Sequence, residues 1–369
     1  MTIINTYYHH INRMEVEQKL KLITRNLQEY HGLEQIRQIL EQRSLKIYWG
    51  TAPTGRIHIG YLVPLMKIAD YLATGCEVKI LFADLHAMLD NLKSTHELVQ
   101  LRCDYYEKMI KTILGALGVE LDKLIFVRGS SFQLTPEYTS DVYKISTLSS
   151  LHDCKKAGAE VVKQTENPKL SGLLYPILQA LDEQYLDVDV QAGGIDQKRI
   201  LMFAADVLPT IGYSKRCHLM TPMLTAINAQ PSANLENISN TKMSSSNLNS
   251  KIDLLDSKGE IKRKINRAYC LEGDLTFNPL MDLMKLVIFP LLSNQSINTF
   301  VINRPEKYGG PASYDNYDTL SEDFTNKNLH PQDLKLGIID CLNNFIEKIR
   351  IKFNDKESIN LLKSAYPIN

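Results

Sequence analysis

The sequence has little of what marks several common classes of protein. Its six cysteines are dispersed and form no CxxC pair, so neither a zinc site nor a disulfide framework is supported. No apolar run reaches the length of a membrane span, and the N-terminus lacks the basic start and apolar stretch of a secretory signal. We therefore expect a cytoplasmic protein with no membrane contact and no protein-bound metal.

An excess of charge of one sign is also missing. Lysine plus arginine and aspartate plus glutamate each number 42, so the formal net charge is zero. The whole chain thus gives no electrostatic argument for binding nucleic acid, and DNA is not expected as a partner. Local phosphate contacts remain open, because basic clusters occur at 155–156 and 262–264. Each cluster can equally be a solvated helix face.

The length of 369 residues exceeds the usual size of a single hydrophobic core, which favours one large domain and a smaller one. We expect a disordered or accessory tail at 1–13 and a large domain over 14–250. That domain should open with a helix running to about residue 30. The remainder, 251–369, has a mainly helical pattern and is expected to form the smaller, α-helical domain.

Within 46–213, short apolar runs such as 77–82 and 123–127 alternate with longer helical patterns. This alternation predicts an α/β fold, a Rossmann-like doubly wound parallel sheet with helices on its faces. Ligands of such sheets bind at the carboxyl ends of the strands, near the switch point. Between about 227 and 250 the chain is rich in Asn and Ser, which predicts a long mobile loop.

Two motifs are the most informative pattern in the chain. Residues 53–60 read PTGRIHIG and follow an apolar strand at 46–50, so backbone N–H groups and the His58 imidazole can meet a phosphate there. Residues 242–246 read KMSSS and place Lys242 in a hydroxyl-rich loop that can fold over a triphosphate. Each motif alone is weak, since HIG occurs by chance and KMSSS can be a polar turn. In this order within an α/β domain, they predict an ATP site.

A row of polar side chains follows further along the chain. Tyr175, Gln179 and Asp182 lie at i, i+4 and i+7, so on a helix they project from one face. This face is either a binding surface or an exposed polar one. Pro176 suits the first turn of a helix, which predicts that the helix begins near Tyr175.

A second candidate for the pocket is the turn at 189–197. It leads from a strand through two glycines into a helix, which lets a ligand approach the backbone closely. Gln197, at the end of this turn, can aim its amide toward that ligand.

Together, these motifs resemble the tyrosyl-tRNA synthetases of class I, especially their eukaryotic cytosolic branch. The resemblance extends over roughly 45–353 and rests on five strings, at 46–55, 80–87, 171–182, 193–199 and 242–246. It implies that the carboxylate of L-tyrosine attacks the α-phosphate of ATP and that pyrophosphate is released. The tyrosyl group is then transferred to the 3′-terminal adenosine of tRNA(Tyr). Such a reaction needs no protein nucleophile, because alignment and neutralisation of phosphate charge suffice.

The resemblance also implies roles for individual residues. Tyr48 and Asp182 match the residues that bond the tyrosine hydroxyl, and Tyr175, Gln179 and Gln197 match those that hold its amino group. A phenylalanine ligand would leave the first pair without a partner, so no editing domain is expected. ATP is a substrate that brings Mg²⁺ with it, and its expected contacts are Gly50, Ala52, His58, Gly60 and Lys242, with Ser244 assisting at the pyrophosphate.

Two positions depart from the class pattern. Tyr61 replaces the usual second histidine of the first motif, and Ser245 replaces the usual second lysine of the loop. Eukaryotic members resemble this sequence at both positions, so we do not interpret them as loss of activity. They do leave Lys242 with less help.

In the smaller domain, Tyr308, His330 and Asp333 match the anticodon-reading positions of the family. An aromatic face and a carboxylate are suitable for an unstacked loop base. The alternative is structural, with Asp333 as a helix cap and Tyr308 as a loop aromatic. The resemblance further implies a homodimer whose tRNA reaches across both subunits, without the extra tRNA-binding domain of some animal relatives.

Other kinds of protein share part of this pattern. A tryptophanyl-tRNA synthetase shares the fold and both motifs, but the pairing of Tyr48 with Asp182 suits a phenol. A synthetase-like protein that only signals or binds, or a nucleotide-binding module, would show no tyrosine-dependent chemistry. The Gln100-Leu101-Arg102 tripeptide lacks the first acid of a cytokine-like Glu-Leu-Arg, which weakens a secreted role.

Overall fold

The computed structural model describes residues 15–91, 94–162, 169–231, 243 and 250–367. The tail expected at 1–13 and most of the loop expected at 227–250 lie outside the described residues, as do Lys242 and Ser244. Met243, between those two in sequence, is described.

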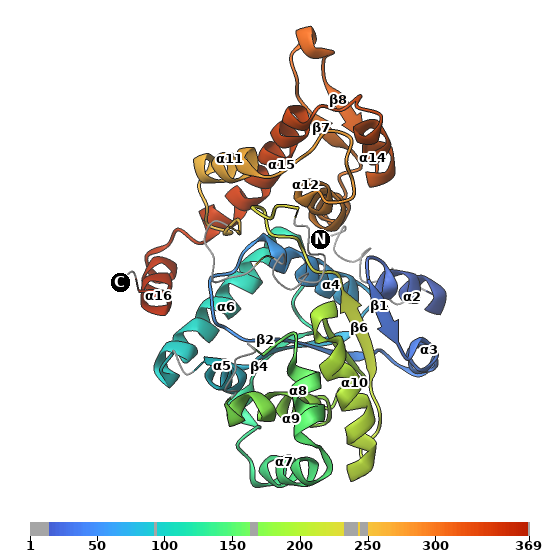
Figure 1. Cartoon of the computed structure of the whole chain (residues 1–369), viewed down its shortest axis with the longest axis vertical. Coiled ribbons are helices and arrows are strands. Elements are labelled where there is room, and N and C mark those ends of the chain that lie inside the picture. The colour runs from blue at the N-terminus through green and yellow to red at the C-terminus, as the bar shows by residue number, and fades with distance from the viewer. Residues whose placement is uncertain (1–14, 92–93, 163–168, 232–242, 244–249, 368–369) are drawn as a thin grey trace, which may run out of the picture.

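A six-stranded sheet organises the N-terminal part of the chain (Figure 1). Its strands, in the order β1-β6-β5-β2-β3-β4, are Glu29–His31 (β1), Lys46–Thr51 (β2), Glu77–Phe82 (β3), Leu124–Arg128 (β4), Val190–Gly194 (β5) and Cys217–Thr221 (β6). Strands β2 to β6 pair in parallel, and only β1 pairs antiparallel, at the edge beside β6. The chain therefore winds outward in both directions from the β2–β5 contact, which confirms the doubly wound α/β prediction and places the switch point there.

Helices cover both faces of this sheet (Figure 1). They are α2 (Val16–Thr24), α3 (Leu33–Gln42), α4 (Leu62–Ala73), α5 (Asp84–Asn91), α6 (His96–Ala116), α7 (Pro136–Leu148), α8 (Leu151–Gly158), α9 (Leu170–Tyr185) and α10 (Lys198–Val207). Single turns are η1 (Ile59–Tyr61), η2 (Gly129–Ser131), η3 (Ile195–Gln197) and η4 (Leu208–Ile211). None of the helices in the described part of the chain is long and apolar enough to cross a membrane.

Two expected helix boundaries were wrong. The first helix ends at Thr24 instead of about residue 30, because Asn26 adopts a positive φ of 59° and the chain then joins the sheet as β1. Helix α9 begins at Leu170, so Pro176 lies inside it instead of in its first turn. The proline removes one N–H donor there, but the helix packs against α8 and α10, and this packing outweighs the local cost.

The C-terminal part is mainly helical, as expected, with one small two-stranded sheet. Its elements are α11 (Lys258–Arg267), α12 (Pro279–Leu283), the π-helical turn η6 (Met284–Ile288), α13 (Phe289–Asn294), β7 (Phe300–Ile302), η7 (Glu306–Tyr308), β8 (Ala312–Tyr314), α14 (Tyr317–Thr325), α15 (Pro331–Lys352) and α16 (Lys356–Ala365). Helix α11 begins with a capping box in which Ser257 and Glu260 exchange hydrogen bonds.

A continuous apolar core joins the two parts. Leu62 of α4, Leu291 of α13 and Phe345 of α15 belong to one cluster of buried side chains. Helix α16 leaves the C-terminal helices and packs against α6, beside the sheet (Figure 1). Just beyond α16, the Tyr366 hydroxyl donates to the carbonyl oxygen of Gly55 at 2.9 Å.

Alternation along β2 separates the core from the candidate site. Ile47 and Trp49 point into the main core, with α4 and α6, whereas Tyr48 lies in a separate cluster with Leu81 and Leu186 on the opposite face. That opposite face is the one that α9 covers, since the Tyr48 hydroxyl reaches the backbone of this helix. Strand β2 thus delivers one buried polar side chain, that of Tyr48, to the α9 side of the sheet.

Candidate active site

The first half of the site is the turn that follows β2, here called the ATP loop (residues 52–60). The carbonyl of Ala52 accepts from the N–H of Thr54 at 2.9 Å and closes the start of the turn. At its end, the buried His58 caps η1, and its Nδ1 accepts from the N–H of Gly60 at 3.1 Å. Because Nδ1 is an acceptor, a neutral ring carries its proton on Nε2.

His58 is held in that neutral form by its surroundings. Burial, and secondarily the positive charge of Lys251, lowers the pKa of His58 from its ordinary value to about 3. A neutral imidazole with its proton on Nε2 is a hydrogen-bond donor with a fixed direction. It can donate to a phosphate oxygen without changing charge.

Gly60 is required by the same geometry. A β-carbon at this position would lie 2.8 Å from Cε1 of His58 and 3.0 Å from its Nδ1, which is closer than real contacts allow. The Met243 sulfur lies 3.8 Å from that β-carbon position, and the Met243 N–H donates to the carbonyl of Leu224 at 2.9 Å. The one described residue of the KMSSS motif therefore lies beside the HIG motif.

The second half of the site is a buried carboxylate on α9. Asp182 is 1% exposed, and its Oδ1 accepts from Gln133 Nε2 at 2.7 Å and from the Tyr138 hydroxyl at 2.9 Å. Its Oδ2 is equally buried and has no hydrogen-bond partner among the described residues. Burial raises the pKa of Asp182 to about 7, while the bonds from Gln133 and Tyr138 lower it.

Tyr48 lies close to this carboxylate. It is buried on the α9 face of the sheet, and its hydroxyl donates to the Gln179 carbonyl at 3.4 Å. Burial, followed by the negative charge of Asp182, raises the pKa of Tyr48 well above its ordinary value. The phenol therefore stays protonated, and a neutral hydroxyl and a buried acceptor share the α9 side of the sheet.

The other three expected pocket residues gather nearby. The Gln179 Nε2 donates to Oε1 of Gln197 at 2.8 Å, which joins α9 to the turn after β5. A β-carbon on Gly193 would lie 3.1 Å from that Oε1, so the glycine gives the Gln197 amide its room. Tyr175 is buried, with its ring 4.5 Å from that of His86 in an edge-on contact. The structure thus brings together Tyr175, Gln179, Asp182, Gln197 and Tyr48.

Sequence reasoning missed the two residues that hold Asp182. Gln133 follows η2 and Tyr138 lies in the first turn of α7, more than forty residues before α9 reaches Asp182. No spacing rule connects them to it. The only local signal there is Thr135 before Pro136, which marks a helix start and says nothing about a ligand.

A large cavity in the described part of the chain lies outside this pocket. It measures about 760 Å³ and opens between α8 and α10. Its charged lining residues are Glu29, Asp153, Lys156, Glu160, Lys198, Arg199 and Asp206. Acids and bases are mixed, so charge does not indicate a ligand. No group of three or more His, Cys, Asp or Glu suited to a metal occurs in the described part of the chain.

The expected anticodon residues lie at one end of the C-terminal part. Tyr308 is 62% exposed in η7, and Arg304, before this turn, donates to the Asp333 carboxylate at 3.3 Å. The N-cap of α15 is His330, whose Nδ1 accepts from the N–H of Gln332 at 3.1 Å. The structural alternative for Asp333 was therefore wrong, because the cap is His330.

Comparison with known proteins agrees with this geometry. Residues 40–347 match the family model described as tRNA synthetases class I (W and Y). The cytoplasmic tyrosine–tRNA ligase of Gallus gallus is 51% identical over 95% of this chain, and that of Saccharomyces cerevisiae 48% identical over 94%. A crystal structure of tyrosyl-tRNA synthetase complexed with L-tyrosine from Archaeoglobus fulgidus is 36% identical, with a TM-score of 0.81, and covers 92% of this chain and 99% of its own.

The chain therefore belongs to the class I tRNA synthetases (W and Y). Within this family, its high-identity relatives are tyrosine–tRNA ligases of eukaryotic cytosolic type. The chain spans 64% of the length of the chicken relative and 87% of the yeast one.

Loss of one of the two donors to Asp182 should weaken the binding of tyrosine. In Gln133→Met the carboxylate loses one donor, its pKa rises further, and its charged form becomes scarcer near neutral pH. We expect KM for tyrosine to rise about ten-fold at pH 7, the usual cost of one charged hydrogen bond. The rise in KM as pH falls should also begin at a higher pH than in the wild type. Steady-state kinetics across pH 6 to 9 measure both.

Gln184→Met is the matched control, since Gln184 lies on the same helix but bonds Arg216 instead of Asp182. Its pH dependence should follow that of the wild type. Identical profiles for the two variants would contradict the role of Gln133.

Proposed function

We propose that the protein is a tyrosine–tRNA ligase of the cytoplasm. It joins L-tyrosine to the adenylate part of ATP as tyrosyl-adenylate with release of pyrophosphate, and then transfers the tyrosyl group to the 3′-terminal adenosine of tRNA(Tyr) with release of AMP. The observation that carries the proposal is the buried Oδ2 of Asp182, an acceptor without a partner among the described residues, beside the Tyr48 hydroxyl. The hydroxyl of a phenol can donate to Asp182 and accept from Tyr48. Residues 14–250 would form the catalytic domain.

Selection of tyrosine follows from the same pair. The substrate hydroxyl donates to Asp182 and accepts from Tyr48, while phenylalanine would leave Oδ2 of Asp182 buried and unpaired. Tyrosyl-tRNA synthetases are the established example of this penalty and reject phenylalanine by about 10⁵-fold, so we expect a preference of that order. The amide of Gln179, with Tyr175 and Gln197, holds the amino group of the substrate.

Activation of the amino acid depends on alignment. The carboxylate of tyrosine attacks the α-phosphate of ATP, and the bond to the pyrophosphate oxygen breaks. The Nε2–H of His58 donates to a phosphate oxygen. Because Gly60 has no β-carbon, the His58 ring has room beside it. ATP brings Mg²⁺, which neutralises phosphate charge, and the adenosine lies along Gly50 and Ala52. Lys242 and Ser244 act on the departing pyrophosphate.

Exchange of labelled pyrophosphate into ATP tests the activation step. We expect exchange that depends on tyrosine, with tryptophan and phenylalanine at background. Lys242→Ala should lower the exchange rate by about 100-fold or more, the order of magnitude for one charge-stabilising group, and change KM for tyrosine little. Exchange that depends on tryptophan would indicate a tryptophanyl-tRNA synthetase instead. No exchange with any amino acid, from folded protein with Mg²⁺ present, would favour a binding protein.

Recognition of tRNA(Tyr) is assigned to the C-terminal part, 251–369. Tyr308 offers an exposed ring on which a base can stack, and Asp333, tethered through Arg304, offers a carboxylate to a base edge. His330 borders them at the N-cap of α15.

The anticodon assignment predicts a difference between two RNA substrates. Asp333→Ala should lose about ten-fold or more in kcat/KM with full tRNA(Tyr), because one base contact is removed. Charging of a minimal acceptor stem, which has no anticodon, should be unchanged. Equal losses on both RNAs would mean that the substitution perturbs the fold.

A homodimer is the proposed assembly. Helices α7 and α8, the residues before α7 and the start of α9 expose apolar side chains, namely Leu134, Tyr143, Leu148, Leu151 and Leu170. Large apolar side chains exposed on neighbouring helices are typical of interfaces. Two copies paired through this face would cover it.

Sedimentation equilibrium tests the assembly. The wild type should have about twice the 42.0 kDa of one chain, and Leu151→Asp should shift the mass toward one chain, because a charge at a buried interface is costly. Ile351→Asp, an equally exposed site on α15, is the control and should stay dimeric. A wild type of one-chain mass would end the proposal.

A further inference from the structure

A segment after the KMSSS motif is bound directly to the ATP loop. The N–H of Ile59 donates to the carbonyl of Ile252 at 2.9 Å, and the N–H of Leu254 donates to the carbonyl of Ile57 at 3.4 Å. Between them, His58 and Asp253 form an isolated antiparallel bridge. Residues 250–257, here called the anchor segment, therefore fix the backbone on both sides of the candidate phosphate donor.

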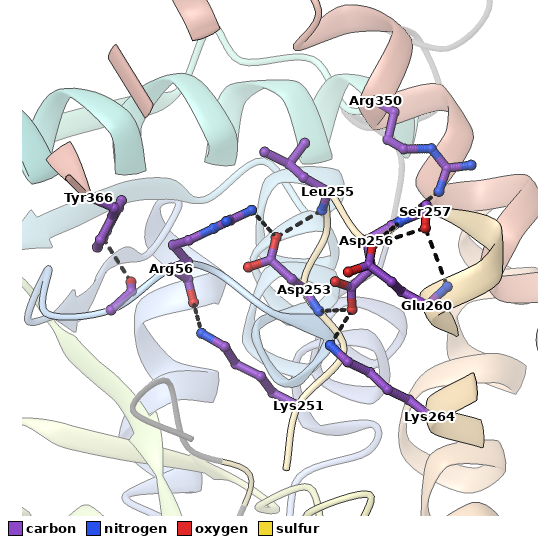
Figure 2. A network of polar contacts seen from close by, with 11 residues as sticks. Arg56, Lys251, Asp253, Leu255, Asp256, Ser257, Glu260, Lys264, Arg350 and Tyr366 are labelled. Carbon is purple, nitrogen blue, oxygen red and sulfur yellow. Dashed lines mark hydrogen bonds and ion pairs between the residues drawn. The ribbon is translucent and has the colours of Figure 1, made fainter. Parts of the chain in front are cut away.

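Charged side chains surround this bridge (Figure 2). The Arg56 guanidinium donates to the Asp253 carboxylate at 2.9 Å. Asp256 accepts from the N–H of Asp253 at 2.9 Å and from the Lys264 ammonium of α11 at 2.6 Å. These groups link the ATP loop to the first helix of the C-terminal part.

Lys251 is the most deeply buried cation of this group. It is 1% exposed, and its ammonium donates to the main-chain carbonyl of Arg56 at 3.3 Å (Figure 2). Burial lowers the pKa of Lys251, while Asp253 raises it. A lysine ammonium is strongly hydrated in water, so its burial is costly unless something else compensates. Such a cost within the site suggests that this charge has a function.

Resting on the proposed function, we propose that Lys251 is a positioning residue for activation of the amino acid. It holds the ATP loop through the Arg56 carbonyl and keeps a fixed positive charge beside His58. After burial, this charge is the second cause that lowers the pKa of His58. Such a charge acts on ATP phosphates without reorganising during the reaction.

The position of Lys251 also suits a chain that lacks the second lysine of the loop. Ser245 stands at that place, so the motif itself carries one cation less than the class pattern. Lys251 lies beyond the motif, on a segment that is paired with the ATP loop in the structure. It supplies positive charge from the anchor segment instead of from the motif.

Other charged groups around the bridge bear on the design of a test. The charged groups come from the ATP loop, the anchor segment, α11 and α15, and are Arg56, Asp253, Asp256, Lys264 and Arg350, and the neutral phenol of Tyr105 on α6 lies with them. Lys264 has the same charge as Lys251 and is also buried, but its partner is Asp256. It is therefore the matched control.

Three substitutions separate the charge of Lys251 from its hydrogen bond. Lys251→Met removes both, Lys251→Gln keeps a donor for the Arg56 carbonyl, and Lys251→Arg keeps charge and donor. In the pyrophosphate-exchange assay we expect KM for ATP to rise about ten-fold or more in K251M, with KM for tyrosine within about two-fold of the wild type. K251Q should show most of the same loss, and K251R should recover to within about three-fold. Lys264→Met should leave KM for ATP nearly unchanged.

The outcomes distinguish this role from a structural one. Equal loss with both substrates in K251M, no rescue in K251R, or the same loss in Lys264→Met would overturn it. If K251M does not fold, the comparison of K251Q with K251R decides the matter. Absence of tyrosine-dependent exchange in the wild type would defeat the proposed function and this role together. Normal exchange by K251Q, in contrast, would defeat the role of Lys251 alone.

Discussion

The parallel pairing of β2 with β5 is the contact on which the candidate site depends. The two strands are distant in sequence, and their carboxyl ends point to the same edge of the sheet. The ATP loop follows β2, and the turn that carries Gln197 follows β5. Helix α9, which leads into β5, is thereby placed over the face from which Tyr48 projects. This register sets the positions of Tyr48 and Gln197 relative to each other and to α9.

Side chains at the pocket are held by groups from other elements, and this limits what a sequence can reveal. The spacing of Tyr175, Gln179 and Asp182 on one helix face follows from the helical period, so it could be predicted. The donors to Asp182 could not, because Gln133 and Tyr138 reach it through the tertiary arrangement of η2, α7 and α9. Periodicity predicts which face of a helix a residue occupies, but it does not predict which residues of other elements contact that face.

Element boundaries show the same division. The doubly wound sheet and the helical C-terminal part follow from hydrophobic patterns, which are properties of long segments. The start of α9 depends on packing that outweighs Pro176, and the edge strand β1 depends on pairing with β6. These boundaries are determined by contacts with distant parts of the chain, so local propensity predicts them poorly. For Lys242 and Ser244, which lie outside the described residues, the motif alone supports the assigned roles.

The fold accepts unfavourable burial where the chemistry is proposed to occur. Asp182 and Asp253 each have one carboxylate oxygen without a partner in the described part of the chain, and His58 is kept neutral by its buried position. Groups of this kind lower stability, and proteins concentrate them at sites that a ligand completes. The large core shared by the sheet and the C-terminal helices offsets that loss.

The Tyr366 hydrogen bond to the carbonyl of Gly55 joins residues 311 positions apart. During synthesis, the ribosome releases the ATP loop long before it releases Tyr366. A nascent chain can form its sheet early, because domains fold as their segments emerge. This contact on the ATP loop has to wait until residue 366 has left the ribosomal exit tunnel. The Gly55 carbonyl also accepts from the Tyr106 hydroxyl, so the later of its two hydrogen bonds waits for synthesis of the segment that follows α16.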